Sequence, residues 1–228
     1  MGTRIRLATL PELPFQNENQ RLVRVVFRRL NLPGSLVLAF ENSVYFTHGS
    51  SPLHADDDSE EIIYVRRGVG RVQIDDHQVP VGPGSAVAVP RSVRHRVVNT
   101  GQDVLEHLLI CADITRPAPL PPHPPEPEDL LTAGAGSRLE RLSCKRLQLK
   151  QGESSSPLAY RDREVIYSLS GGFAVIEVST PDGAYQWEYA IDSSHAFWLP
   201  PGTRHAFRNV GDSELTAIGF FCDGRSGA

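Results

Sequence analysis

One pattern of thirteen residues occurs twice in the chain, and it limits the possible folds more than any other feature of the sequence. "VPRSVRHRVVNTG" covers residues 89–101, and "LPPGTRHAFRNVG" covers residues 199–211. Pro, Arg, His, Asn and Gly recur at the same offsets in both copies. An ordered repeat of this kind predicts duplication of one structural unit, so we expect two similar domains.

Short β-like segments fill most of the chain outside its centre. Runs rich in Val, Ile, Leu and aromatic residues, such as "EIIYVRR" and "FAVIEVS", alternate with turns marked by Gly, Pro, Asn or Asp. Little of the sequence has the period of an amphipathic helix. Many short strands at regular spacing favour an all-β fold built of antiparallel sandwiches or barrels.

The boundary between the two repeats is a proline-rich segment, "RPAPLPPHPPEPEDL". Seven prolines lie between Pro117 and Pro127. Such a run resists both helix and central strand and forms an extended connector. The sequence therefore predicts a domain over residues 1–115, a linker over 116–130 and a second domain over 131–228.

Composition and charge exclude several classes of partner. The formal net charge of the 228 residues is −4, which gives no reason to expect nucleic acid or an anionic membrane. The first twenty residues lack the apolar core of a secretory signal, and no apolar run approaches the length of a membrane span. We expect a cytoplasmic protein whose three cysteines, Cys111, Cys144 and Cys222, are reduced.

Two segments of the first half have the spacing of a metal-site motif. In "PLHADDDSEEIIYVRRG" (52–68), six residues separate Glu61 from Gly68, and three residues separate His95 from Asn99 further on. These spacings and those of the preceding Gly and Pro resemble the two signature motifs of the cupin superfamily. Because the core of both halves carries the pattern, the chain resembles a bicupin. That resemblance implies two tandem jelly-roll (cupin) β-barrels.

The resemblance also implies metal ligands. His54, Glu61 and His95 match the positions through which cupins bind a divalent metal. Asp56 stands where the motif has its second histidine, and Ser92 stands where the motif has glycine. Residues i and i+2 of a strand share one face, so Asp56 can converge with His54. It either binds the metal directly or orients a histidine.

The remaining acidic residues of this stretch are assigned differently. Glu60 and Glu61 point to opposite faces of a strand, and the spacing to Gly68 together with the match to Glu164 selects Glu61 as the inward one. Asp57, Asp58 and Glu60 are therefore predicted to form a solvated turn. Imidazole and carboxylate together suit Fe(II), Mn(II), Ni(II) or Zn(II), and we favour Fe(II) because two histidines with one carboxylate form the facial set of non-haem iron.

The second half has lost part of this pattern. Aligning "PL" of "PLAYRDREVIYSLSG" (157–171) with "PL" of the first half places Ala159 and Arg161 where His54 and Asp56 stand. In this alignment Glu164 and His205 are retained. We therefore expect a degenerate motif in the C-terminal barrel, with Arg161 repelling a cation, and one metal per chain, in the N-terminal barrel.

Other polar residues of the first half are candidates for substrate binding or proton transfer. His48 and His107 rank first, because each is flanked by apolar strand residues, and are predicted as catalytic residues. Tyr64, Arg66 and Arg94 rank below them. The alternation of residues does not show which of these side chains face inward.

The resemblance covers many activities, so function is narrowed only in part. The leading hypothesis is a non-haem Fe(II) dioxygenase that acts on a small chelating substrate in the N-terminal barrel. The alternatives are a non-redox metal-dependent isomerase, cyclase or lyase, or a bicupin that binds a small ligand without turnover. Exposed edge strands favour pairing, so a homodimer is a further expectation.

Overall fold

The structure is a computed structural model that describes residues 5–18, 20–116, 130–132, 139–180 and 183–224. Most of the predicted linker, residues 117–129, lies outside these ranges. The described chain is almost entirely β-structure, with two short 3-10 helices, η1 (Leu10–Glu12) and η2 (Arg29–Asn31). The all-β prediction is confirmed.

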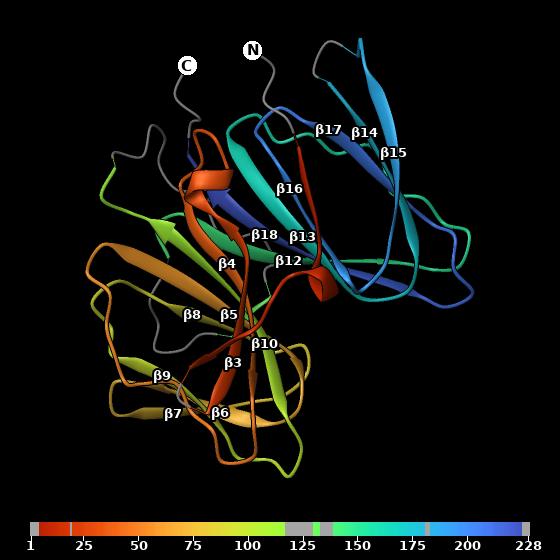
Figure 1. Ribbon diagram of the computed structural model, residues 1–228. Helices are drawn as coiled ribbons and strands as arrows, with labels where there is room; N and C mark the ends of the chain where they lie inside the picture. Colours follow the sequence, from red (N-terminus) through yellow and green to blue (C-terminus); the bar gives the residue numbers. More distant parts are fainter. Residues whose placement is uncertain (1–4, 19, 117–129, 133–138, 181–182, 225–228) are drawn as a thin grey trace.

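The first half of the chain forms one barrel from two facing sheets (Figure 1). The larger sheet has seven strands in the order β11-β8-β5-β10-β4-β3-β2, and the smaller has the order β7-β6-β9. The bounds of these strands are β2 Gln16–Glu18, β3 Arg21–Arg28, β4 Val37–Tyr45, β5 Ser59–Arg67, β6 Gly70–Ile74, β7 His77–Val81, β8 Ala86–Val89, β9 His95–Asn99, β10 Leu105–Asp113 and β11 Leu131–Thr132.

The second half forms a similar barrel. Its larger sheet has the order β1-β16-β13-β18-β12, and its smaller sheet has the order β15-β14-β17. The bounds are β1 Arg6–Thr9, β12 Leu142–Leu149, β13 Arg163–Gly171, β14 Ala174–Ser179, β15 Gln186–Ile191, β16 His195–Leu199, β17 Arg204–Asn209 and β18 Leu215–Asp223. Two barrels of the same plan therefore follow one another in the chain.

Alternation along the strands divides the apolar residues among three cores. In β5, Ile63 and Val65 face the interior of the first barrel, whereas Ile62 and Tyr64 face the second barrel. The core between the barrels includes Phe220, whose ring lies 6.1 Å from that of Tyr64 in an edge-to-face contact. The two large sheets thus bury their outer faces against each other.

Each barrel also receives a strand from the opposite half of the sequence. β1, near the N-terminus, pairs with β16, and β11 pairs with β8 across the linker. β1 and β11 therefore pair outside the barrels to which the predicted limits at residues 115 and 131 assign them, and the limits themselves stay a prediction. The two barrels are held together by main-chain hydrogen bonds as well as by apolar contact.

Two buried glutamates form a reciprocal link between the barrels. The Glu60 carboxylate accepts hydrogen bonds from the backbone N–H groups of Glu140, Arg141 and Leu142, at 2.6–2.7 Å. The Glu164 carboxylate accepts a hydrogen bond from Ser35 Oγ at 2.6 Å. It accepts two more from Leu36 N and Trp198 Nε1. The prediction that Glu60 belongs to a solvated turn is wrong, because Glu60 is 2% exposed.

Candidate metal centre

The main chain brings two of the predicted ligands together. His54 lies in the segment before β5, and His95 is the first residue of β9. The two residues form an isolated antiparallel bridge, with His54 N donating to His95 O at 3.1 Å and His95 N donating to His54 O at 2.8 Å. Their ring centroids are 4.3 Å apart. Two histidines far apart in sequence are thus fixed side by side.

Backbone carbonyls orient both imidazole rings. His54 Nδ1 lies 3.0 Å from Pro52 O, and His95 Nδ1 lies 3.0 Å from Val93 O. A carbonyl only accepts, so each Nδ1 carries a proton, and Nε2 is the remaining nitrogen of each ring. This arrangement leaves Nε2 as the metal-binding atom, as in known histidine ligands held by an outer hydrogen bond.

Glu61 completes a compact group. It lies near the start of β5, faces the barrel interior and is 6% exposed. Its Oε2 lies 3.1 Å from His95 Nε2. Although burial disfavours a charged imidazole, the hydrogen bond and the charge of Glu61 raise the pKa of His95. One ligand atom from each of His54, Glu61 and His95 lies within 4.8 Å of the others, so the residues fit a divalent metal.

Asp56 lies at the rim of this group. Its Oδ2 is 3.6 Å from His54 Nε2, and its side chain is 45% exposed. Asp56 is not among the three residues whose ligand atoms converge. Its backbone carbonyl accepts a hydrogen bond from Ser92 N, and Ser92 has a φ of 60°, which explains why the family motif has glycine there. Asp56 as a direct ligand stays a prediction.

The two histidines predicted as catalytic lie elsewhere. His48 is exposed in a left-handed turn beyond the end of β4, and the structure does not bring it to the three-residue group. His107 faces the interior of the same barrel, where it pairs with Val65. The residue of β10 that pairs with Glu61 is Cys111, four positions further along the strand. Burial lowers the pKa of His107 to about 4.

Of the three lower-ranked residues, Tyr64 and Arg66 contact the second barrel, and Arg94 is exposed. Tyr64 faces the core between the barrels. Arg66 binds Glu106 and backbone carbonyls of the second barrel at Leu169 and Ser193. The side chains of Tyr64 and Arg66 therefore serve contacts outside the interior of the first barrel.

Sequence reasoning missed the polar interior of β3 and β4. Tyr45 Oη lies 3.2 Å from both Arg21 Nη1 and His107 Nε2. Ser43 and Glu41 lie on the same face of β4, because residues two apart share a face. A signal was present in "LVLAFENSVYF", where Glu and Ser interrupt an apolar strand in phase with one another.

The structural equivalence between the two barrels is shifted by one residue from the equivalence in the sequence alignment. His54 bridges to His95, and the residue that bridges to His205 is Leu158. Glu61 pairs with Val89 in the first barrel, and Val165 pairs with Leu199 in the second. Since Val89 and Leu199 both precede the repeated proline, Val165 is the counterpart of Glu61.

This register corrects the predicted equivalences. Leu158 and Tyr160, rather than Ala159 and Arg161, occupy the places of His54 and Asp56. Glu164 is the counterpart of Glu60, because both carboxylates hold the opposite barrel. Only His205 of the four ligand positions is retained, and the prediction that Arg161 repels a cation is wrong, since Arg161 is exposed.

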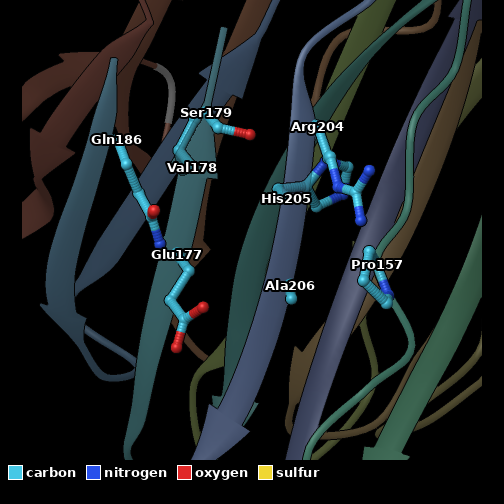
Figure 2. A pocket seen from close by; sticks show the side chains of 8 residues that line it. All are labelled: Pro157, Glu177, Val178, Ser179, Gln186, Arg204, His205 and Ala206. Atoms are coloured by element: carbon cyan, nitrogen blue, oxygen red, sulfur yellow. The ribbon is translucent and has the colours of Figure 1, made fainter. Parts of the chain in front are cut away.

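The second barrel carries a hollow of about 250 Å³ on its smaller sheet (Figure 2). Arg204 of β17 and Glu177 of β14 project beside it from neighbouring strands. The hollow is lined by Pro157, Glu177, Val178, Ser179, Gln186, Arg204, His205 and Ala206. It shares no residue with the metal-site group of the first barrel.

Comparison with known proteins agrees with this architecture. Residues 44–111 match the family model described as "Cupin domain". Protein SchB of Streptomyces halstedii is 38% identical over 78 residues, which are 34% of this chain and 56% of SchB, so the match spans little more than half of that relative.

Solved structures resemble both barrels together. Oxalate decarboxylase of Bacillus subtilis at pH 4.6 superposes with a TM-score of 0.75 and 16% identity, over 98% of this chain and 77% of that chain. Oxalate decarboxylase of Lactobacillus farciminis with formate gives 0.76 and 13%, over 96% and 86%. The molecule is a protein of two tandem cupin barrels. Residues 44–111 thus match the cupin domain, and the chain as a whole shares the two-barrel fold of these decarboxylase structures.

No helix in the described ranges is both long and apolar enough to cross a membrane.

Proposed function

We propose that the chain is a metal-dependent enzyme that acts on a small chelating molecule in its N-terminal barrel. The observation that carries this proposal is the convergence of His54, Glu61 and His95 within 4.8 Å, with both imidazoles oriented by backbone carbonyls. A bound divalent metal would supply Lewis-acid polarisation of a substrate oxygen or, as iron, a route for electrons to O2.

The chain's own residues define how a substrate would approach. The side chain of His54 is 43% exposed, whereas that of His95 is 4% exposed. The site therefore opens on the His54 side and is closed behind His95 and Glu61. Because the protein's ligand atoms lie on one side of the metal position, a chelating substrate would bind from the opposite side.

Two reaction classes have specific support. Lyase chemistry is supported by the solved structures of the same fold, which are decarboxylases, one of them studied for its Mn(II) centres. An Fe(II) dioxygenase is supported by the two-histidine, one-carboxylate set itself. We place the lyase or isomerase reaction first, because the carboxylate of Glu61 in the ligand group, with that of Asp56 nearby at the rim, favours a hard ion such as Mn(II).

The test is metal content followed by oxygen uptake. The full chain is loaded with Mn(II) or Fe(II), and bound metal is counted before and after His95→Ala, with His205→Ala as the matched control. We expect about one metal per chain in the parent and in the control. Turnover without oxygen consumption supports the lyase or isomerase, and consumption with turnover supports the dioxygenase. Ligand binding without turnover in either form would replace the enzyme by a binding protein.

A further inference from the structure

Glu41 is a carboxylate on the inner wall of the N-terminal barrel. In the sheet, Glu61 lies opposite Cys111, and Cys111 lies opposite Ala39, two residues before Glu41. Paired residues share a face, so Glu41 points to the same interior as Glu61. With strands about 5 Å apart and about 3.3 Å per residue, roughly 12 Å separates the two Cα atoms.

The interior beside Glu41 is open to solvent. Ile63 and Val65, which face the packed part of the barrel, are at most 1% exposed. By contrast Glu41, Leu109 and Cys111, on the wall next to the metal-site group, each keep intermediate exposure. A small molecule bound at the metal site therefore has accessible space toward β4 and β10.

Glu41 has no partner of its own in this space. None of the described residues forms a hydrogen bond with its carboxylate. Arg21 and Arg28 are the cations that act on its charge, and Arg21 is engaged by Glu18 at 3.0 Å and by Tyr45 at 3.2 Å. Burial raises the pKa of Glu41; Arg21 opposes this shift, and the negative charges of Glu18 and Glu61 add to it.

Two polar atoms without hydrogen-bond partners among the described residues lie one row further along the same wall. Ser43 and His107 are directly opposite each other on β4 and β10, and they are 0% and 2% exposed. Among the described residues, neither Ser43 Oγ nor His107 Nδ1 has a hydrogen-bond partner. Buried polar atoms are normally paired, so this wall is built to meet hydrogen-bonding groups that the chain does not supply.

The second barrel shows that the fold does not require this polarity. The pairing of β12 with β18 places Lys145 at the position of Glu41, and Leu147 at the position of Ser43. Ala217 takes the place of His107. The barrel without the metal-site group therefore has a cation and apolar side chains where the first barrel has an anion and unpaired polar groups.

We propose that Glu41 sets the charge of the substrate in the N-terminal barrel. The preferred ligand is a neutral or singly charged chelator with a hydroxyl or amino group that donates to Glu41, and a dianion of the size of oxalate is disfavoured. This inference rests on the proposed function. Its physical reason is that Glu61 and the nearby Asp56 already place two negative charges beside a divalent ion, so that Glu41 leaves the site with excess negative charge.

The test uses the full chain loaded with Zn(II), at pH 8. Calorimetry measures the affinities of oxalate, acetohydroxamic acid and glycolohydroxamic acid, the last two differing by one hydroxyl group. In Glu41→Gln we expect oxalate to bind about tenfold more tightly, the size of a like-charge interaction at reduced dielectric. Asp76→Asn, which removes an exposed negative charge from the same barrel, is the matched control and should change oxalate affinity less than twofold.

Two further comparisons sharpen the result. The parent should prefer glycolohydroxamic acid over acetohydroxamic acid, and Glu41→Leu should lose about tenfold of that preference, because a hydrogen bond to a charged acceptor is lost. Glu41→Lys gives this position the positive charge that Lys145 has in the second barrel. It should strengthen oxalate binding further, and it replaces Glu41→Gln in the test if that variant does not fold.

The outcomes separate this inference from the proposed function. Equal zinc affinity in parent and Glu41→Gln, with oxalate affinity unchanged, overturns the role of Glu41 and leaves the metal site standing. If the parent binds no zinc, or if His95→Ala binds zinc as tightly as the parent, the proposed function fails and this inference falls with it.

Discussion

His95 and His205 occupy the same position in the two barrels, but their pKa values are shifted in opposite directions. Each begins or nearly begins the strand after the repeated proline, and each has Nδ1 tied to the carbonyl two residues earlier. The Nε2 atom of His95 meets the Glu61 carboxylate at 3.1 Å, whereas that of His205 meets Tyr167 Oη at 3.1 Å. The pKa of His95 is raised, and burial lowers that of His205 to about 4.

The difference between the two pKa shifts arises from one neighbouring residue more than from the fold. Glu61 supplies a negative charge that makes its histidine a member of a ligand group, and Val165 at the same place supplies none. His205 is therefore a neutral core residue among aromatic rings, with Tyr167 at 5.4 Å and Phe207 at 6.1 Å between ring centroids. One backbone plan holds a polar site in one barrel and an apolar core in the other.

The largest expected effect concerns the reciprocal glutamates that hold the barrels together. Glu164→Leu leaves Ser35 Oγ, Leu36 N and Trp198 Nε1 buried without their acceptor. We expect a loss of roughly 3–5 kcal/mol in the free energy of unfolding, the cost of orphaning several buried groups. Urea denaturation measures it, with Glu214→Leu on the exposed surface as the control. A loss below 1 kcal/mol would show that the link between the barrels is apolar.

The second expectation is a pH dependence of stability from His107 and His205. Both have a pKa near 4 in the folded protein against 6.5 in the unfolded chain. Because the folded state favours the neutral ring, this contribution is present above pH 6.5 and is lost as the pH falls toward 4. Each histidine should cost roughly 3 kcal/mol when fully protonated. His205→Gln should flatten the pH dependence between 6.5 and 4; an unchanged slope would mean that His205 is not neutral when folded.

The metal-site comparison comes next. His54→Ala, Glu61→Ala and His95→Ala each remove a ligand and should lower metal affinity at least about 100-fold, since loss even of an outer partner costs about 10- to 100-fold. His205→Ala, the matched change in the second barrel, should leave metal affinity within about twofold. Metal titration of the four variants decides between them. Equal losses from His95→Ala and His205→Ala would show that both barrels bind metal.

The smallest expected effects separate Asp56 from the exposed turn. Asp56→Asn keeps the shape of the side chain and removes its charge. A loss of metal affinity near 100-fold would make Asp56 a direct ligand, and a loss near tenfold would place it outside the ligand group as a partner of His54. Asp57→Asn and Asp58→Asn, which are exposed, should change stability by less than about 0.5 kcal/mol. Thermal unfolding and metal titration measure both.

The sequence alone was sufficient for the duplication, the all-β class and the spacing of His54, Glu61 and His95. These depend on local periodicity and on repeated residue types, which are visible in one dimension. The pattern was not sufficient to align the halves, because "PL" recurs one residue away from the structural equivalence. In β-structure a shift of one residue moves every side chain to the opposite face, so Ala159 and Arg161 took the places of Leu158 and Tyr160.

Tertiary structure alone decided the roles of residues whose partners are distant in sequence. Glu60 reads as part of an acidic turn, yet its carboxylate is bound by backbone groups 80 to 82 residues away. His48 and His107 have similar apolar flanks, yet one lies in an exposed turn and the other in a barrel interior. The physical reason is that burial and charge at a site are set by the strands that pair beside it, and pairing in this fold joins residues far apart along the chain.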